Sequence, residues 1–299
     1  MTMELHQLRY FVAVSQSGNF SRAAERCHVS QPSLSQQILK LERRLGQPLL
    51  NRLGRRAVLT DAGRLLLERA TAILAAVDDA ERRLGDRGAL PGGRLAVGVI
   101  PTIAPYLLPP ALKGFARRCP NVDMAIQEDV TRNLIAAAVD GDLDLAIAAL
   151  PIAEERLQVE SLLTEPLLVA APRGHPLLRR RKIKVQDLAL ERFILLNEMH
   201  CLGEQVLSLC RAHDCQPTIA CRSAQIATVQ ALIALGQGIS LLPAMACRAD
   251  RSKRLVYRPL ATEESRRTIV AVWHKQRYHS PAAESFLQEL RISCNSERL

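Results

Sequence analysis

The fold of the N-terminal part of this 299-residue chain is decided by residues 18–35, which run Gly18-Asn19-Phe20-Ser21-Arg22-Ala23-Ala24-Glu25-Arg26-Cys27-His28-Val29-Ser30-Gln31-Pro32-Ser33-Leu34-Ser35. Phe20, Ala23 and Ala24 form the apolar side of a short helix, and the small alanines let another helix approach closely. Ser30 is a preferred N-cap, and Pro32 suits a first helical turn, where its missing N–H is not needed. The stretch therefore predicts a short helix, a turn and a second helix beginning at Ser30.

This second helix is predicted to reach Leu45, because Leu34, Ile38 and Leu41 recur on one side of it. Its other faces carry serine and amide side chains first and cationic ones later. Glutamine pairs bidentately with adenine, and serine accepts several base partners, whereas Lys and Arg suit phosphates. We therefore predict DNA contacts from eight residues: Ser30, Gln31, Pro32, Ser33, Ser35, Gln36, Lys40 and Arg43.

A basic turn, Arg52-Leu53-Gly54-Arg55-Arg56, follows between two short apolar pairs. It predicts a hairpin wing whose Arg52 and Arg55 reach the DNA backbone or minor groove. Residues 5–64 hold ten Lys and Arg against three Asp and Glu, a net charge of +7 out of +10 for the chain. Such a basic block indicates a nucleic-acid partner. The alternative is an ordinary polar helix and hairpin with a solvated surface.

A long helix is predicted next, capped by Thr60 and ending near Gly85. Its apolar residues recur at spacings of 4, 3, 4, 3 and 4, which is the heptad pattern of helices that pair with a second copy. The residues of this seam are Leu66, Ala70, Ile73, Val77, Ala80 and Leu84. Packing against the chain's own C-terminal part is the alternative. Residues 86–93, which include glycines and a proline, predict a linker.

The remainder of the chain alternates short aliphatic strands with helical stretches, which predicts an α/β architecture. We expect strands at 95–99, 122–127, 143–149, 166–171, 193–196, 217–221, 238–242 and 268–273, and helices at 106–118, 131–140, from 201, at 225–235 and at 281–293. A break near Glu165-Pro166 and a late return near 267 indicate two lobes, with a cleft between them where ligands of such folds sit.

The N-terminal motifs resemble the DNA-binding domain of LysR-type transcriptional regulators. The positions that carry the resemblance are Leu8-Arg9-Tyr10-Phe11, Gly18-Asn19-Phe20-Ser21-Arg22-Ala23-Ala24, Val29-Ser30-Gln31-Pro32-Ser33-Leu34-Ser35, Leu41-Glu42, Leu45-Gly46 and Leu59-Thr60-Asp61-Ala62-Gly63. The resemblance implies a multidomain chain: a mainly helical winged helix-turn-helix domain at 1–60, a dimerising linker helix and hinge at 61–89, and a periplasmic-binding-protein-like α/β effector domain at 90–299. In that domain, lobe I would span about 90–165 and 267–299, and lobe II about 166–266. Implied partners are double-stranded promoter DNA, RNA polymerase and further copies in a homodimer or homotetramer.

Two of the eight cysteines, Cys201 and Cys210, lie nine residues apart in a predicted helix. Nine helical residues rise ~13.5 Å, whereas a disulfide needs Cα atoms within about 7 Å. The pair is therefore helical or bonded, but not both. At a helix start the macrodipole stabilises a thiolate, which attacks peroxide to give a sulfenic acid that condenses with a second thiol. With Cys215 and Cys221 nearby, a zinc site and simple burial are the alternatives.

Further stretches resemble the peroxide-sensing members of the same family: Ile100-Pro101-Thr102, Pro105-Tyr106-Leu107-Leu108-Pro109, Thr131, His200-Cys201-Leu202 with Gln205 and Cys210, and Gly238-Ile239-Ser240-Leu241-Leu242-Pro243-Ala244. This resemblance implies that Cys201 is the peroxidatic and Cys210 the resolving cysteine. It also implies that Thr102 and Thr131 hold hydrogen peroxide, that His200 assists, and that glutaredoxin or thioredoxin resets the disulfide. Arg267 or its neighbour Arg266 would approach the same pocket.

Each of these residues also has an ordinary structural interpretation. Thr102 and Thr131 suit helix caps, and the Arg266-Arg267 pair suits a solvated surface. Gly203 stands where peroxide-sensing relatives carry a basic residue, and a helical glycine, which costs about 1 kcal/mol against alanine, is expected to ease unwinding. Cys215 and Cys221 are expected to compete as resolving thiols. The rival function is a LysR-type regulator gated by a small metabolite in the interlobe cleft.

Several classes of function are disfavoured by the sequence. No apolar run approaches the ~18 residues of a membrane span, and residues 1–7 lack the features of a signal peptide. We therefore expect a cytoplasmic protein without a membrane partner, where thiols stay reduced. Because neither a nucleotide-binding glycine-rich loop nor a Ser/His/Asp arrangement can be argued from spacing, we expect no cofactor, no metal and no enzymatic activity.

Overall fold

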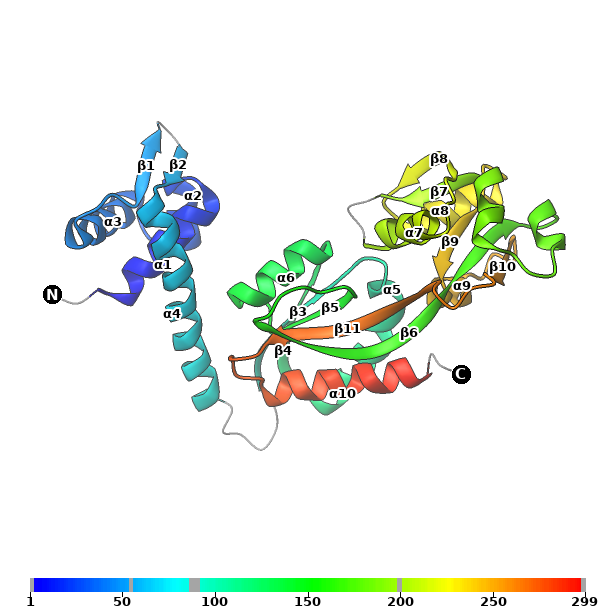
Figure 1. The fold of residues 1–299 in the computed structure, drawn as a ribbon. Coiled ribbons are helices and arrows are strands. Elements are labelled where there is room, and N and C mark those ends of the chain that lie inside the picture. The colour runs from blue at the N-terminus through cyan, green and yellow to red at the C-terminus, as the bar shows by residue number, and fades with distance from the viewer. Residues whose placement is uncertain (1–2, 54–55, 86–91, 198–200, 297–299) are drawn as a thin grey trace. The chain divides into compact units, whose positions relative to one another are not determined.

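The computed structural model describes residues 3–53, 56–85, 92–197 and 201–296. The chain divides into two compact units, Met1–Gly85 and Asp86–Leu299 (Figure 1). Two of the predicted site residues, Arg55 and His200, lie outside the described residues. No helix in the described ranges is long and apolar enough to cross a membrane.

The first unit is a helical bundle with a two-stranded antiparallel hairpin. Phe11, Val14, Leu34 and Ile38 are fully buried in its core, to which the hairpin and the last helix also contribute. The helices and hairpin predicted from the sequence are confirmed. The elements are α1 (Leu5–Ser17), α2 (Phe20–Arg26), α3 (Gln31–Leu45), β1 (Leu50–Leu53), β2 (Arg56–Leu59) and α4 (Asp61–Gly85).

Side-chain caps begin three of these helices. The Asn19 side chain accepts hydrogen bonds from two N–H groups in the first turn of α2, at 2.8 and 3.1 Å. Ser30 Oγ accepts from the Ser33 N–H at 3.4 Å, and Thr60 Oγ1 accepts from the Gly63 N–H at 2.9 Å. Each bond satisfies a donor that has no partner inside the helix. The predicted caps at Ser30 and Thr60 are confirmed.

The residues of the heptad seam predicted on α4 have two different environments in the structure: the early ones pack into the core of the first unit, and later ones are exposed. Ala70 is fully buried and Leu66 half-buried in the core of the first unit, because α4 packs against α1. The expectation that Ala70 faces a second copy is therefore wrong, whereas for the half-buried Leu66 it stays a prediction. Ile73, at 39 % exposure, and Ala80 remain exposed, so pairing through the later part of the seam stays a prediction. The side chain of Leu84 lies outside what the structure describes.

The second unit has two lobes, each with its own hydrophobic core. Its main elements are β3 (Gly92–Val99), α5 (Ala104–Arg118), β4 (Asn121–Glu128), α6 (Thr131–Asp140), β5 (Leu145–Ala149), β6 (Leu157–Pro172), β7 (Arg192–Leu196), α7 (Cys201–Ala212), β8 (Thr218–Ser223), α8 (Ile226–Ala234), β9 (Ser240–Pro243), α9 (Ala244–Ala249), β10 (Leu255–Pro259), β11 (Arg266–His274) and α10 (Pro281–Ser296).

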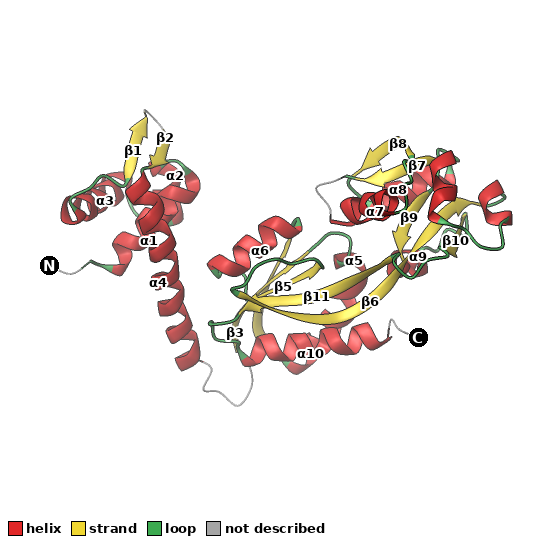
Figure 2. Ribbon diagram, viewed as in Figure 1, coloured by secondary structure: helices red, strands yellow, loops and turns green. Residues whose placement is uncertain are grey.

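The first lobe is a five-stranded sheet in the order β4-β3-β5-β11-β6, in which β3 runs parallel to both β4 and β5. Helix α6 covers one face of this sheet, and α5 and α10 pack together on the other (Figure 2). In the second lobe, β6 pairs with β9 and β10, and β7 pairs with β8. Backbone hydrogen bonds between β7 and Ile239 join these strands, and α7 and α8 pack beside them.

The chain passes between the lobes inside strands. The first part of β6 pairs with β11, and its later part pairs with β9 and β10. The predicted crossing near Glu165-Pro166 thus falls where β6 exchanges its partners, but both residues lie within β6, so the chain crosses without an interruption of the strand. A proline lacks a donor and usually marks a strand end; Pro166 occupies instead the place where β6 exchanges one set of partners for another. The sequence also failed to predict residues 157–165 as strand, and it missed α9 and β10.

Candidate functional site

The predicted DNA-reading side chains lie on one outer surface of α3. Leu34, Ile38 and Leu41 are buried against α1 and α2, which turns the opposite face of α3 outward. Ser35 is half-buried on that face. The other predicted residues of this helix and its cap are exposed to solvent: Ser30, Gln31, Pro32, Ser33, Gln36, Lys40 and Arg43.

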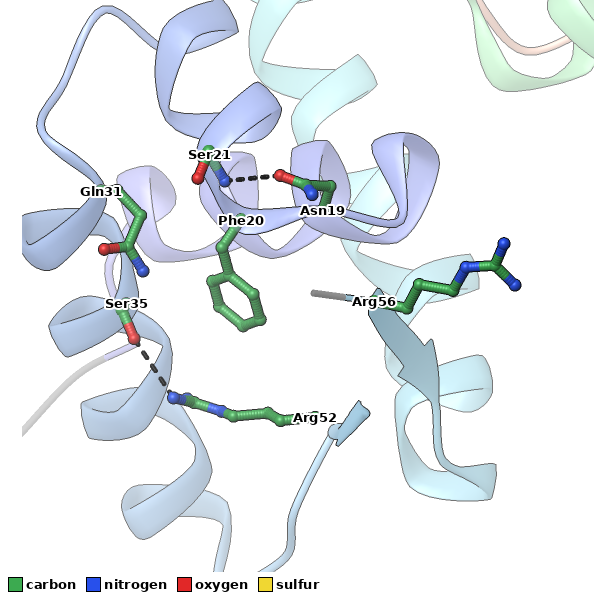
Figure 3. Close-up of a pocket in the computed structure, with 7 residues that line it drawn as sticks. All are labelled: Asn19, Phe20, Ser21, Gln31, Ser35, Arg52 and Arg56. Atoms are coloured by element: carbon green, nitrogen blue, oxygen red, sulfur yellow. Dashed lines mark hydrogen bonds between the residues drawn. The ribbon is translucent and has the colours of Figure 1, made fainter. Parts of the chain in front are cut away.

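A groove of about 640 Å³ opens between the start of α2, helix α3 and the hairpin (Figure 3). Arg52 of β1 projects toward α3, where its Nη1 donates to Ser35 Oγ at 3.2 Å, and its guanidinium lies 4.9 Å from the centre of the Phe20 ring. The Arg56 side chain extends away from Arg52. The groove therefore unites three predicted residues with others that the sequence did not single out. The full lining is Asn19, Phe20, Ser21, Gln31, Ser35, Arg52 and Arg56.

Glu42 joins the hairpin to α3. Its Oε1 accepts hydrogen bonds from the N–H groups of Leu49 and Leu50, at 2.8 and 3.1 Å. Its other oxygen lies 3.8 Å from an Arg52 nitrogen. This carboxylate sits on the side of α3 that meets β1, so it positions the hairpin and Arg52 relative to the DNA-reading face.

A second candidate site lies at the carboxyl edge of the parallel strands in the first lobe. In the ladder, Val99 of β3 pairs with Glu128 of β4 and with Ile147 of β5. Because parallel strands end at the same edge of a sheet, the segments that follow them meet there, which is where open α/β sheets bind ligands. These segments carry Thr102 and Thr131.

Arg267 organises one side of this edge. Its Nε donates to Glu165 Oε1 at 2.8 Å, while Nη1 and Nη2 donate to the hydroxyl and carbonyl oxygens of Thr102 at 3.1 and 3.2 Å. Glu165 Oε2 also accepts from the Met245 N–H at 2.8 Å. The Arg267 side chain has no exposed surface, whereas that of Arg266 is 44 % exposed. The solvated-surface interpretation is therefore wrong for Arg267.

Neither threonine caps a helix. Ile103 occupies the N-cap of α5, and Thr102 bonds Arg267 instead. Val130 is the N-cap of α6, so Thr131 is its first helical residue and the cap interpretation is wrong. Among the described residues, Thr131 Oγ1 and Gln205 Oε1 are buried side-chain oxygens without a hydrogen-bond partner. Buried polar groups are nearly always hydrogen-bonded, so these two unpaired oxygens indicate that a small polar molecule binds here.

Helix α7 of the second lobe reaches this edge. Gln205 Nε2 donates to the carbonyl oxygen of Leu150, the residue directly after β5, at 2.6 Å. Cys201 is the first residue of α7 and lies one turn before Gln205, on the same face of the helix. It is half-buried and packs against the core of the first lobe. The structure thus brings Cys201 to the lobe that holds both threonines.

Cys210 lies near the other end of α7, 1 % exposed and in the core of the second lobe. Both cysteines are unbonded and belong to one uninterrupted helix, where nine residues rise ~13.5 Å. Burial, together with the neighbouring Cys215, raises the pKa of the Cys210 thiol to about 12. In this state Cys210 is therefore a protonated thiol, held away from Cys201.

Gly203 has a packing role that the sequence did not reveal. It is buried, and a Cβ atom at this position would lie 2.4 Å from the carbonyl oxygen of Leu196 and 3.1 Å from that of Asn197. The glycine thus lets the first turn of α7 approach the end of β7. That Gly203 also eases the unwinding of α7 stays a prediction.

The remaining cysteines are mostly buried. Cys119, Cys247 and Cys294 lie in the lobe cores, as expected for isolated cysteines, and Cys27 is half-buried. Within the part of the chain that the structure describes, no three His, Cys, Asp or Glu side chains gather as a metal site would require. The zinc alternative for the cysteine cluster thus has no support among these residues.

Comparison with known families matches both units of the chain. Residues 5–64 match the family described as bacterial regulatory helix-turn-helix protein, lysR family, and residues 88–295 match the LysR substrate binding domain. The chain belongs to the LysR family of DNA-binding transcriptional regulators, and its fold is that of the family: a helix-turn-helix domain followed by a two-lobe substrate-binding domain.

Its relatives include OxyR proteins. Over 272 residues the chain is 37 % identical to the DNA-binding transcriptional dual regulator OxyR of Escherichia coli K12, an alignment covering 91 % of this chain and 89 % of that protein. A full-length OxyR mutant from Pseudomonas aeruginosa has a TM-score of 0.78 at 31 % identity, covering 97 % and 98 % of the two chains. A hydrogen-peroxide-bound OxyR mutant from Corynebacterium glutamicum has a TM-score of 0.64 at 30 % identity, covering 99 % and 96 %.

Proposed function

We propose that this regulator responds to hydrogen peroxide through Cys201 and Cys210. The Cys201 thiolate attacks one peroxide oxygen and releases hydroxide, which leaves a sulfenic acid. The Cys210 sulfur then attacks the Cys201 sulfur, forms the disulfide and releases water. OxyR relatives, one of them with bound peroxide, support this assignment.

The observation that carries the proposal is the meeting of α7 with the carboxyl edge of the first lobe. The Gln205–Leu150 hydrogen bond holds the start of α7 there, and the two buried oxygens of Thr131 and Gln205 lack partners among the described residues. Hydrogen peroxide is small and carries two O–H donors and two acceptor oxygens. Bound near Cys201, it would donate to Gln205 Oε1 and exchange a hydrogen bond with the Thr131 hydroxyl.

Arg267 orients the Thr102 hydroxyl so that it can also bind peroxide. A guanidinium donates hydrogen bonds only, so the Thr102 hydroxyl must accept from it. The hydroxyl hydrogen is then left to donate to peroxide. Arg267 therefore acts through Thr102, and His200 remains part of the proposed site as the residue before Cys201.

Forming the disulfide would unwind α7, because the intact helix separates the two sulfurs. Unwinding removes the Gln205–Leu150 bond between the lobes and exposes the surroundings of Cys210. We infer that this changes the packing of effector domains in a homotetramer and thereby the spacing of the DNA-binding domains. Contact with RNA polymerase and reduction by glutaredoxin or thioredoxin complete the proposed cycle.

For DNA, we propose that α3 enters the major groove of the promoter. Gln31 and Gln36 would read base edges, and Lys40 and Arg43 would contact phosphates. The hairpin residues Arg52 and Arg55 would contact the flanking backbone or minor groove. The exposure of the α3 face and the groove shared with the hairpin support this arrangement.

The test treats the reduced full-length protein with one equivalent of peroxide and compares DNA footprints before and after. Trypsin releases Cys201 and Cys210 in one peptide, 193–211, so their disulfide appears as that peptide two hydrogens lighter. We expect this product and a changed footprint in the wild type and in Cys221→Ser, a matched control with a half-exposed thiol. Cys201→Ser should show neither. A Cys201→Ser protein whose footprint still shifts with peroxide would refute the proposal.

A further inference from the structure

Helix α7 ends in a tight motif that joins two cysteines. The Cys215 N–H donates to the Cys210 carbonyl oxygen at 2.9 Å, and the Asp214 N–H donates to the Arg211 carbonyl oxygen at 3.2 Å. Asp214 has φ +51°, in the left-handed region. These are the two hydrogen bonds and the left-handed residue of a Schellman motif. In such motifs the side chains at the positions of Cys210 and Cys215 commonly touch, usually as an apolar contact.

Here those two positions hold thiols. Cys210 and Cys215 are each 1 % exposed, and both lie in the core of the second lobe. Burial raises the pKa of both thiols above the usual range, so both are protonated while the helix is intact. Cys221, the other thiol of the cluster, is only half-buried.

The two possible partners of Cys210 make different demands on the helix. A bond to Cys201 spans nine helical residues and requires α7 to unwind. A bond to Cys215 joins residues whose backbones are already hydrogen-bonded across one turn, within the reach of a disulfide. This bond leaves the helix from Cys201 to Cys210 intact. Refolding of α7, with burial of its apolar face, therefore favours the second bond over the first.

We propose that Cys215 takes the disulfide over from Cys201. The Cys215 thiolate attacks the Cys210 sulfur of the Cys201–Cys210 bond, a new sulfur–sulfur bond forms, and Cys201 leaves with the electron pair as a thiolate. Cys215 gives its proton to water, and Cys201 regains one from water. Two electrons are exchanged within the protein, so no further oxidant or reductant is needed. The proposal rests on the proposed function as the source of the first disulfide.

The exchange would make the oxidised, unwound state transient. After transfer, α7 can refold with Cys201 reduced, while the oxidation is retained between Cys210 and Cys215. Cys210 is then no longer available as a resolving thiol, so a second peroxide would leave Cys201 as an unresolved sulfenic acid. Full recovery would require reduction of the Cys210–Cys215 bond.

Tryptic mapping separates the two bonds. Cleavage after Arg211 divides Cys210 from Cys215, so a Cys210–Cys215 bond links peptides 193–211 and 212–222, whereas the Cys201–Cys210 bond closes a loop inside 193–211. In Cys221→Ser, where Cys215 is the single cysteine of peptide 212–222, we expect the looped peptide to form first after one equivalent of peroxide. The linked pair should then replace it, while the footprint returns toward that of the reduced protein. If the looped peptide persists and the two linked peptides never form, the proposed disulfide exchange is refuted.

Two variants complete the test. Cys215→Ser and Cys215→Ala should keep the looped peptide and the oxidised footprint at least tenfold longer than Cys221→Ser does. Equal lifetimes in these variants would overturn the proposal. In Cys201→Ser/Cys221→Ser, the thiol oxidant diamide should still link 193–211 to 212–222, and absence of the link would refute the pairing of Cys210 with Cys215. If that link forms while peroxide leaves the wild-type protein reduced, the peroxide-sensing function fails and the Cys210–Cys215 pair stands.

Discussion

The sharpest structural contrast in the chain lies between two adjacent arginines. Arg267 is fully buried and donates three hydrogen bonds to Glu165 and Thr102. Arg266 is 44 % exposed, and its nearest carboxylate oxygen, on Glu263, lies 3.5 Å away. Replacing Arg267 with Met should therefore destabilise the effector unit far more than replacing Arg266 with Met.

The size of the expected loss of stability follows from the burial of the Arg267–Glu165 ion pair. Removing one partner of a buried ion pair leaves an uncompensated charge and costs about 3–5 kcal/mol, here at Glu165, which would retain only the Met245 N–H as a described partner. A surface pair such as Arg266–Glu263 contributes about 0–1 kcal/mol. For a unit of this size, the Arg267→Met change should lower Tm by roughly 6–20 °C. Neutralising the orphaned carboxyl as well, in Arg267→Met/Glu165→Gln, should recover part of the loss.

The chain offers a convenient reporter for this measurement. Its single tryptophan, Trp273, lies on β11, six residues after Arg267, and is half-buried with its ring 5.0 Å from that of His279. Tryptophan fluorescence during urea or thermal unfolding therefore follows the effector unit alone. Equal losses of stability in Arg267→Met and Arg266→Met would refute the assignment of a buried ion pair. A double variant less stable than Arg267→Met would refute the argument from uncompensated charge.

Three further predictions follow from α7 and α3. Gly203→Ala should lower the free energy of unfolding by about 1–3 kcal/mol, because its Cβ crowds the end of β7, despite a gain of about 1 kcal/mol in helix propensity. The exposed control Ser208→Ala should leave the free energy of unfolding nearly unchanged in the same assay. Because burial raises the pKa of Cys210 to about 12, its thiolate fraction at pH 8 is about one in 10⁴. The rate of its alkylation by iodoacetamide should therefore be lower than that of Cys221 and should rise tenfold per pH unit. Rapid labelling of Cys210 at pH 8 would contradict its burial. Arg43→Ala should reduce the slope of log K for promoter DNA against log salt by about 0.9; an unchanged slope would remove Arg43 from the phosphate contacts.

The N-terminal unit was largely predictable because its determinants are local. Caps such as Ser30 act on backbone groups two or three residues away, and the apolar spacing of α3 decides which face is buried. The seam on α4 was predicted less well, since its periodicity is equally compatible with a partner helix and with the chain's own core. Only the packing of α1 against α4 shows that Leu66 and Ala70 belong to that core.

The site around Cys201 and Cys210 also combines features that the sequence determines with features that only the tertiary structure decides. The nine-residue spacing of Cys201 and Cys210 by itself establishes that an intact helix and a disulfide between them exclude each other, because helical rise is a local property. The sequence alone also determined the two-lobe α/β alternation and the basic N-terminal block. The burial of Arg267, the close approach at Gly203 and the proximity of Cys210 to Cys215 were decided only by tertiary structure. The first two depend on segments distant in the chain, and the third depends on how the end of α7 turns back into the core of the second lobe.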